Sequence, residues 1–96
     1  MDTNVNFTPE DLKRFYWHSR RGMLELDLLL VPFAKHQLQN LSSEQLLGYK
    51  LLLEEEDQDL FVWLTKRQAA PTVQLQTAVD LVLSLHAVSH LEWVNS

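Results

Sequence analysis

The fold of this chain is indicated by residues 42–53, which read SSEQLLGYKLLL. Ser42 followed three residues later by Gln45 is a capping-box pattern, in which each side chain accepts a hydrogen bond from a free backbone N–H group. The apolar residues that follow recur at three- and four-residue steps, so that three of them share one helix face: Leu46, Tyr49 and Leu53. The pattern predicts an amphipathic helix that opens at Ser42.

A helix is also predicted near the start of the chain. Thr8 suits the N-cap and Pro9 the first helical position, where its missing N–H group is not needed. Because Gly22 follows, this helix is predicted to end around Arg20 or Arg21.

A second helix is predicted from Gly22 or Met23 to about Leu38. Its apolar stripe consists of Leu26, Leu29, Leu30 and Phe33. Since Pro32 lies within this pattern and lacks a backbone donor, we expect a kink or a short break there.

Two further helices are predicted after residue 53. The first is short, is capped by Asp57 and carries Leu60, Phe61 and Leu64. Phe61, Trp63 and Leu64 are expected to be mostly core, although Trp63 lies on another side of the helix, where it could touch a partner. The last helix is capped by Thr72 and carries an apolar face of Leu75, Ala78, Val79, Val82 and His86.

Five helices joined by short loops predict an all-α fold, a compact bundle of about five helices. The 96 residues form one domain, 1–96, with flexible tails expected at about 1–7 and 90–96. Because the chain contains no cysteine, disulfide scaffolds and zinc–thiolate sites are excluded.

The charge and hydropathy of the chain exclude several partners. Lys and Arg number 8 against 13 Asp and Glu, and this acidic balance argues against nonspecific nucleic-acid binding. The longest charge-free apolar stretch, Leu28–Ala34, is far shorter than the roughly 20 residues of a membrane helix. No secretory signal is visible at the N-terminus. We therefore expect no membrane insertion, and a location in a bacterial-type cytoplasm.

The most informative stretch is residues 17–27, which read WHSRRGMLELD. One interpretation is purely structural: Gly22 stops a helix, and Arg21 and Glu25, four residues apart, form a solvated ion pair. The other is functional: a guanidinium and two carboxylates form a polar docking surface, and Gly22, without a Cβ, lets a partner approach closely.

Residues 21–27, RGMLELD, resemble the RGxxE(L)D signature of the SdhE-type FAD assembly factors, also called succinate dehydrogenase assembly factors. Further matches follow in order along the chain: Trp17, Pro32-Phe33, Leu52-Leu53-Glu54, Asp57 and Asp59–Leu64. The resemblance covers about residues 16–64. It departs from the family pattern at Gln58, where proline is common, and at Leu38, where an aromatic residue is common.

The resemblance implies a helical assembly factor that is not an enzyme. Such a protein binds the flavoprotein subunit of succinate dehydrogenase or fumarate reductase and promotes covalent attachment of FAD to a histidine of that subunit. FAD is then the cofactor of the partner, so neither a stably bound cofactor nor a metal is expected here, and the chain alone is expected to be monomeric. The residues implied at the partner-binding surface are Arg21, Gly22, Glu25 and Asp27, with Trp17, His18 and Met23 beside them.

Two other functions stay open on the residues alone. A carrier that binds FAD itself could hold the dinucleotide with Tyr16, Trp17 and Arg20, although the chain has no glycine-rich phosphate loop. A small helical regulator that binds DNA could use the cations of the first helix, although the net charge of −5 argues against it.

Two further clusters have ordinary structural explanations. His86 and His90 have a spacing that can hold a metal, but they lack a third ligand apart from Glu92. The acid-rich run 54–59 lacks the glycine and the ligand spacing of a calcium loop, so a solvated turn is favoured.

Overall fold

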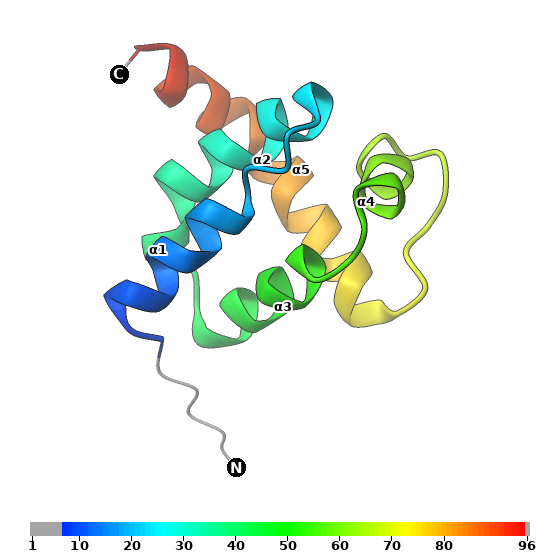
Figure 1. Ribbon diagram of the computed structural model, residues 1–96, viewed down its shortest axis with the longest axis horizontal. Helices are drawn as coiled ribbons and strands as arrows, with labels where there is room; N and C mark the ends of the chain where they lie inside the picture. Colours follow the sequence, from blue (N-terminus) through cyan, green and yellow to red (C-terminus); the bar gives the residue numbers. More distant parts are fainter. Residues whose placement is uncertain (1–6, 96) are drawn as a thin grey trace.

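The computed structural model describes the backbone of residues 7–95 and the side chains of residues 7–86. This part of the chain is helical and contains no strand, which confirms the predicted all-α fold (Figure 1). The elements in order are α1 (Pro9–His18), α2 (Leu24–Gln37), the 3-10 helix η1 (Leu38–Asn40), α3 (Ser43–Leu53), α4 (Asp57–Leu64) and α5 (Val73–Asn95).

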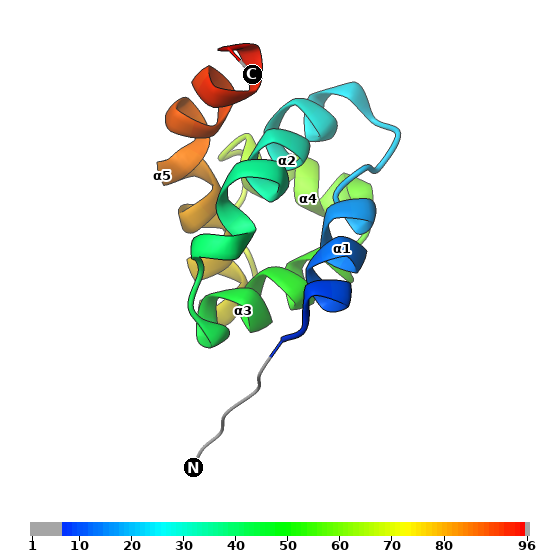
Figure 2. The ribbon, with the colours of Figure 1, turned by 90° about the vertical axis from the view of Figure 1, so that its left-hand side faces the viewer.

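Helix α2 lies at the centre of the bundle. It packs along α5 on one side and against α1 on the other, as the two ribbon views show (Figures 1 and 2). Helix α3 contacts both α1 and α5, and α4 contacts α2 and α5. Helices α1, α3 and α4 are therefore arranged around the α2–α5 pair.

Three helix starts follow the sequence signals. Thr8 and Asp11 form a capping box at α1, with Thr8 Oγ1 accepting from Asp11 N at 3.2 Å. Ser42 and Gln45 form the predicted capping box at α3. Thr72 Oγ1 accepts from Leu75 N at 3.1 Å at the start of α5. Local side-chain capping thus sets these three boundaries.

Other local predictions were wrong. Helix α1 ends at His18, before Arg20. Asp57 does not cap α4, because Glu56 occupies the N-cap position without a side-chain hydrogen bond and Asp57 is the first helical residue. Of the kink or short break expected at Pro32, the break does not occur, since α2 continues through Pro32 to Gln37.

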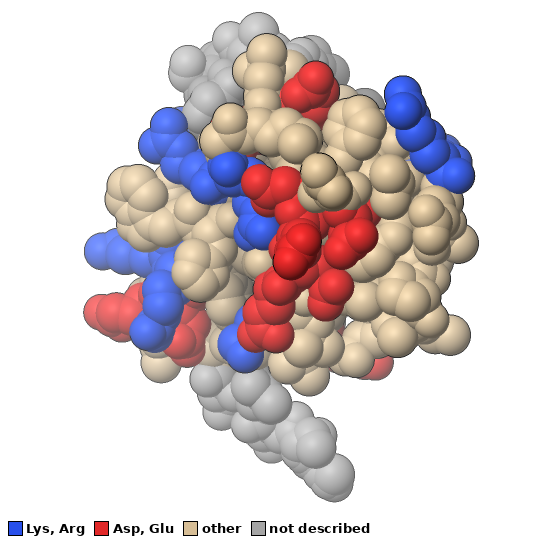
Figure 3. All heavy atoms as spheres, turned by 45° about the vertical axis from the view of Figure 1, so that its right-hand side comes forward, with Lys and Arg blue, Asp and Glu red and all other residues tan. Residues whose placement is uncertain are grey.

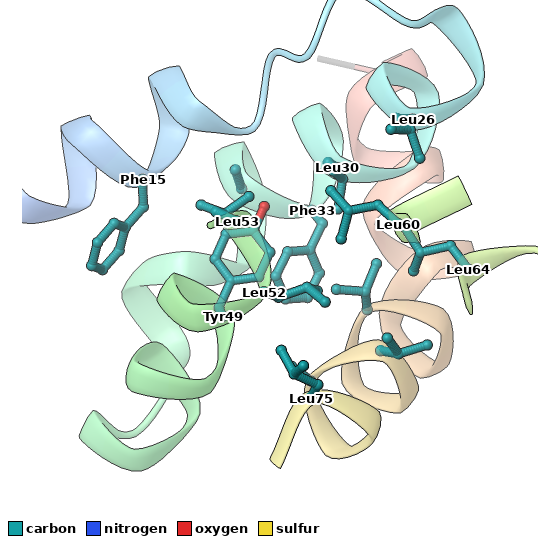
Figure 4. Packing of buried hydrophobic residues seen from close by; sticks show 14 of the residues in the cluster. Phe15, Leu26, Leu30, Phe33, Tyr49, Leu52, Leu53, Leu60, Leu64 and Leu75 are labelled. Atoms are coloured by element: carbon teal, nitrogen blue, oxygen red, sulfur yellow. The ribbon is translucent and has the colours of Figure 1, made fainter. Parts of the chain in front are cut away.

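The core is built from all five helices around Phe33 and Tyr49, whose ring centroids lie 5.1 Å apart (Figure 4). Trp63 belongs to this core, being only 5% exposed, so it is a core residue as expected for most of this helix and offers little surface to a partner. Phe61 is the half-buried aromatic residue of α4, and the Arg67 guanidinium lies 5.2 Å from its ring centroid. At the N-terminal edge of the core, the Phe7 ring packs edge-on against the Phe15 ring, with 5.4 Å between the ring centroids.

Candidate functional site

The loop between α1 and α2 turns at Gly22, which has a φ of +86°. This left-handed conformation costs little for glycine and is unfavourable for residues with a Cβ. Gly22 is exposed, and a Cβ built on it would meet no atom within 4 Å. The space above Gly22 is therefore open to solvent and available to another molecule.

Arg21, by contrast, turns its side chain inward and is 15% exposed there. Its guanidinium donates four hydrogen bonds: Nε to Asp57 Oδ1 at 2.8 Å, Nη1 to the carbonyl oxygens of His18 at 3.1 Å and Leu53 at 2.8 Å, and Nη2 to the carbonyl oxygen of Glu55 at 2.7 Å. Carbonyls at a helix C-terminus lack intrahelical donors, and a nearby cation satisfies them. Arg21 thus joins the end of α1 to the α3–α4 turn.

The two acidic residues of the signature are used differently. Asp27, in the first turn of α2, accepts a hydrogen bond from the backbone N–H group of Arg21 at 2.7 Å. Glu25 is exposed, and its carboxylate makes no hydrogen bond or ion pair with the described residues. The ion pair considered between Arg21 and Glu25 is therefore not formed, because Arg21 pairs with Asp57 instead.

We call Arg21, Gly22, Glu25 and Asp27 the signature corner. Arg21 and Asp27 build its inner side, and Gly22 and Glu25 form its outer side. The corner lies at the surface, so a partner can reach it. However, the guanidinium that was considered as a donor to a partner is occupied by this chain's own acceptors.

Residues flanking the corner add exposed apolar surface. Trp17 is 62% exposed and touches the ring of Tyr16 edge-on, and His18 beside it is exposed. Met23 is half-buried against the core. Sequence patterns missed Leu24 and Leu28, which are 68% and 50% exposed on the first turns of α2. The sequence signal that could have identified them is their i, i+4 spacing, which places both leucines on the face of α2 opposite its buried stripe.

The support beneath the corner was also missed by sequence reasoning. Ser19, fully buried at the C-cap of α1, bonds through its hydroxyl to the hydroxyl of Tyr49 on α3. Burial raises the pKa of Tyr49 well above its ordinary value of 10.0, because the phenolate would lose its hydration. The residue is therefore a neutral phenol that fixes α3 to the end of α1.

The surface charge is divided. On the face drawn in Figure 3, Asp and Glu side chains gather in one patch, with Lys and Arg side chains along its flank. The α3–α4 turn supplies acidic residues beside Arg21, and Asp57 is the one that pairs with it. The run 54–59 thus spans the α3–α4 turn and the start of α4, and it accepts from Arg21 through one carboxylate and one backbone carbonyl.

The described residues offer neither a metal site nor a membrane-spanning helix. Among the residues that the structure describes, no three metal-ligating side chains gather as a site. His86 is half-buried, and the side chain of His90 lies outside the described residues. Within the described residues, no helix has both the length and the apolar character needed to cross a bilayer.

Comparison with known proteins places the chain in a family. Residues 13–86 match a family model described as the flavinator of succinate dehydrogenase. The chain belongs to this flavinator family. A protein named FAD assembly factor SdhE from Pseudomonas aeruginosa is 48% identical over 73 residues, which cover 76% of this chain and 87% of the relative.

More distant members of the flavinator family match a similar share of this chain. The FAD assembly factors SdhE of Mannheimia succiniciproducens and Colwellia psychrerythraea are 44% and 32% identical, covering 81% and 85% of this chain and 91% and 90% of the relatives. The family match also extends beyond Leu64, where the recognised motifs end, and takes in α5 up to His86. The part of α5 up to His86 thus belongs to the matched family region.

Proposed function

We propose that this chain promotes the covalent attachment of FAD to the flavoprotein subunit of succinate dehydrogenase. The observation that carries the proposal is the match of residues 13–86 to the flavinator family, whose relatives are named FAD assembly factors. In this role the chain is an assembly factor that acts on another protein, not an oxidoreductase. The flavoprotein subunit of fumarate reductase is proposed as a second partner of the same kind.

The outer side of the signature corner is the proposed docking surface. Gly22 leaves space for a partner's backbone, and the Glu25 carboxylate is free to accept directional hydrogen bonds. Trp17 and His18 flank this surface, and Trp17 offers the exposed aromatic area that often anchors protein interfaces. Arg21, Asp27 and Met23 are proposed to shape it from within.

The physical basis of the activity is selective binding of one state of the partner. Covalent attachment requires the flavoprotein histidine and the flavin ring to be held in near-attack geometry, and positioning of this kind lowers the barrier by several kcal/mol. A ligand shifts a conformational equilibrium only by its difference in affinity for the two states. A rigid helical bundle that binds the competent arrangement more tightly would raise its population.

In this account FAD stays with the partner, and the chain neither binds it stably nor carries it. We also propose that the chain is monomeric on its own and acts in the cytoplasm. Titration of the purified chain with FAD tests the first point, because stoichiometric tight binding would indicate a carrier instead.

The activity itself is tested by co-expressing a flavoprotein subunit with and without this chain. Covalent flavin is then read as fluorescence of the flavoprotein band on a denaturing gel. The proposal predicts a several-fold stronger band when the chain is present. Equal fluorescence with and without the chain, at equal amounts of flavoprotein, would overturn it.

A further inference from the structure

We propose that Arg21 and Asp57 act together as positioning residues, which hold the signature corner in its docking shape without contacting the partner. This inference rests on the proposed function and deepens it. It assigns a role to Asp57, which lies 36 residues from Arg21 along the chain and outside the corner.

The Arg21 guanidinium has few free donors for a partner. An arginine side chain has five N–H donors, and Arg21 uses four of them on acceptors within this chain. The side chain is also 15% exposed, so only one donor and little surface remain for another molecule.

The hydrogen bonds of Arg21 join the ends of separate helices. We call Arg21 and its acceptors the Arg21 junction. The side chain reaches the last turn of α1, the end of α3 and the first residue of α4, while its backbone N–H group reaches Asp27 in α2. Both the side chain and the backbone N–H group of Arg21 are therefore fixed, and this restricts the position of Gly22, the next residue.

The Arg21 junction needs both Arg21 and Asp57. Leu53 and Glu55 offer only neutral carbonyl oxygens, whereas Asp57 supplies the charge that balances a largely buried guanidinium. Without that carboxylate, a cation would remain among carbonyls with its charge unpaired. Lysine cannot replace the arginine, because its single ammonium group lacks the planar fork that reaches several acceptors.

The experiment compares two matched pairs of variants. Arg21→Gln and Asp57→Asn each break the junction, while Arg20→Gln and Asp59→Asn remove the same charges from neighbouring exposed residues. For each variant, the dissociation constant for a purified flavoprotein subunit is measured together with amide hydrogen exchange at Arg21. Exchange at Leu52, in the buried part of α3, reports whether the whole fold has loosened.

We expect both junction variants to bind about tenfold more weakly or worse. The double variant should bind no more weakly than the worse single variant, because either substitution alone already breaks the contact between Arg21 and Asp57. Exchange at the Arg21 amide should quicken in Asp57→Asn, while exchange at Leu52 does not. Arg20→Gln and Asp59→Asn should stay within about twofold of the wild type.

Two results would overturn the inference. If Asp57→Asn binds as the wild type does while Arg21→Gln fails, the arginine contacts the partner directly. Unchanged exchange at the Arg21 amide in Asp57→Asn would show that the contact between Arg21 and Asp57 does not order the signature corner. If the wild-type chain itself fails to bind the flavoprotein, the proposed function fails instead, and the exchange data alone decide whether the junction orders the corner.

Discussion

The hydroxyl of Tyr49 donates a hydrogen bond to Ser19 Oγ, and Ser19 Oγ donates in turn to the carbonyl oxygen of Phe15 at 2.7 Å. Tyr49 and Ser19 are both fully buried. The pair connects α3 to the end of α1, two residues before Arg21. The signature corner therefore rests on a buried polar contact beneath it as well as on the Arg21 junction.

Replacing Tyr49 by phenylalanine tests this contact. The ring still fills the core, and Ser19 Oγ still has Phe15 as its acceptor, so only the bond between the two hydroxyls is lost. We expect the free energy of unfolding to fall by about 1 kcal/mol. Urea unfolding followed by circular dichroism measures the change, and a variant as stable as the wild type would show that the bond contributes nothing.

The same tyrosine makes stability depend on alkaline pH. Its pKa is raised in the folded state, so the neutral phenol favours folding fully below the unfolded pKa of about 10, and this contribution is lost as pH rises toward the folded pKa. Between pH 10 and 11.5, wild-type stability should therefore fall more steeply than that of Tyr49→Phe. Parallel slopes in the two proteins would contradict the buried, neutral phenol.

Helix α3 can be stabilised at Gly48. A Cβ at this position would lie 3.8 Å from Ala78 Cβ and 4.0 Å from the carbonyl oxygen of Gln74, which are ordinary contact distances. Gly48→Ala should therefore raise the free energy of unfolding by about 0.5–1 kcal/mol, because alanine restricts the unfolded chain and favours the helix. A lower unfolding midpoint in urea would mean that α5 packs too closely for a methyl group.

The end of α4 offers a second stabilising change. Lys66 has a φ of +64°, the left-handed conformation that usually belongs to glycine after a helix. Lys66→Gly should raise the free energy of unfolding by about 1 kcal/mol. Lys66→Ala is the matched control, since it removes the side chain but keeps the Cβ, and it should leave stability nearly unchanged. Equal effects of the two substitutions would place the cause in the lysine side chain.

Local signals in the sequence predicted the helix starts well, because capping depends on residues only three positions apart. Thr8, Ser42 and Thr72 all act as predicted. Asp57 was predicted as a cap by the same reasoning but is the first residue of α4, and its carboxylate accepts from Arg21, which lies far away along the chain.

In the candidate site, too, local sequence patterns were informative and contacts between distant residues were not predicted. The residues of the signature corner are identified by their spacing, and Gly22 is exposed as a docking surface requires. Which of them face inward could not be predicted, since the side-chain acceptors of Arg21 lie on segments that meet it only in the folded chain, apart from His18. An exposed arginine and a buried one have the same sequence pattern.

The most direct test of the account is the affinity of two Gly22 variants for a purified flavoprotein subunit. Both Gly22→Ala and Gly22→Arg place a Cβ at a φ of +86°, so each should lose about 1 kcal/mol of stability. Only arginine adds a long side chain to the open surface. We predict that Gly22→Arg stays folded but binds at least about tenfold more weakly than Gly22→Ala. Equal affinities of the two folded variants would contradict docking at the signature corner.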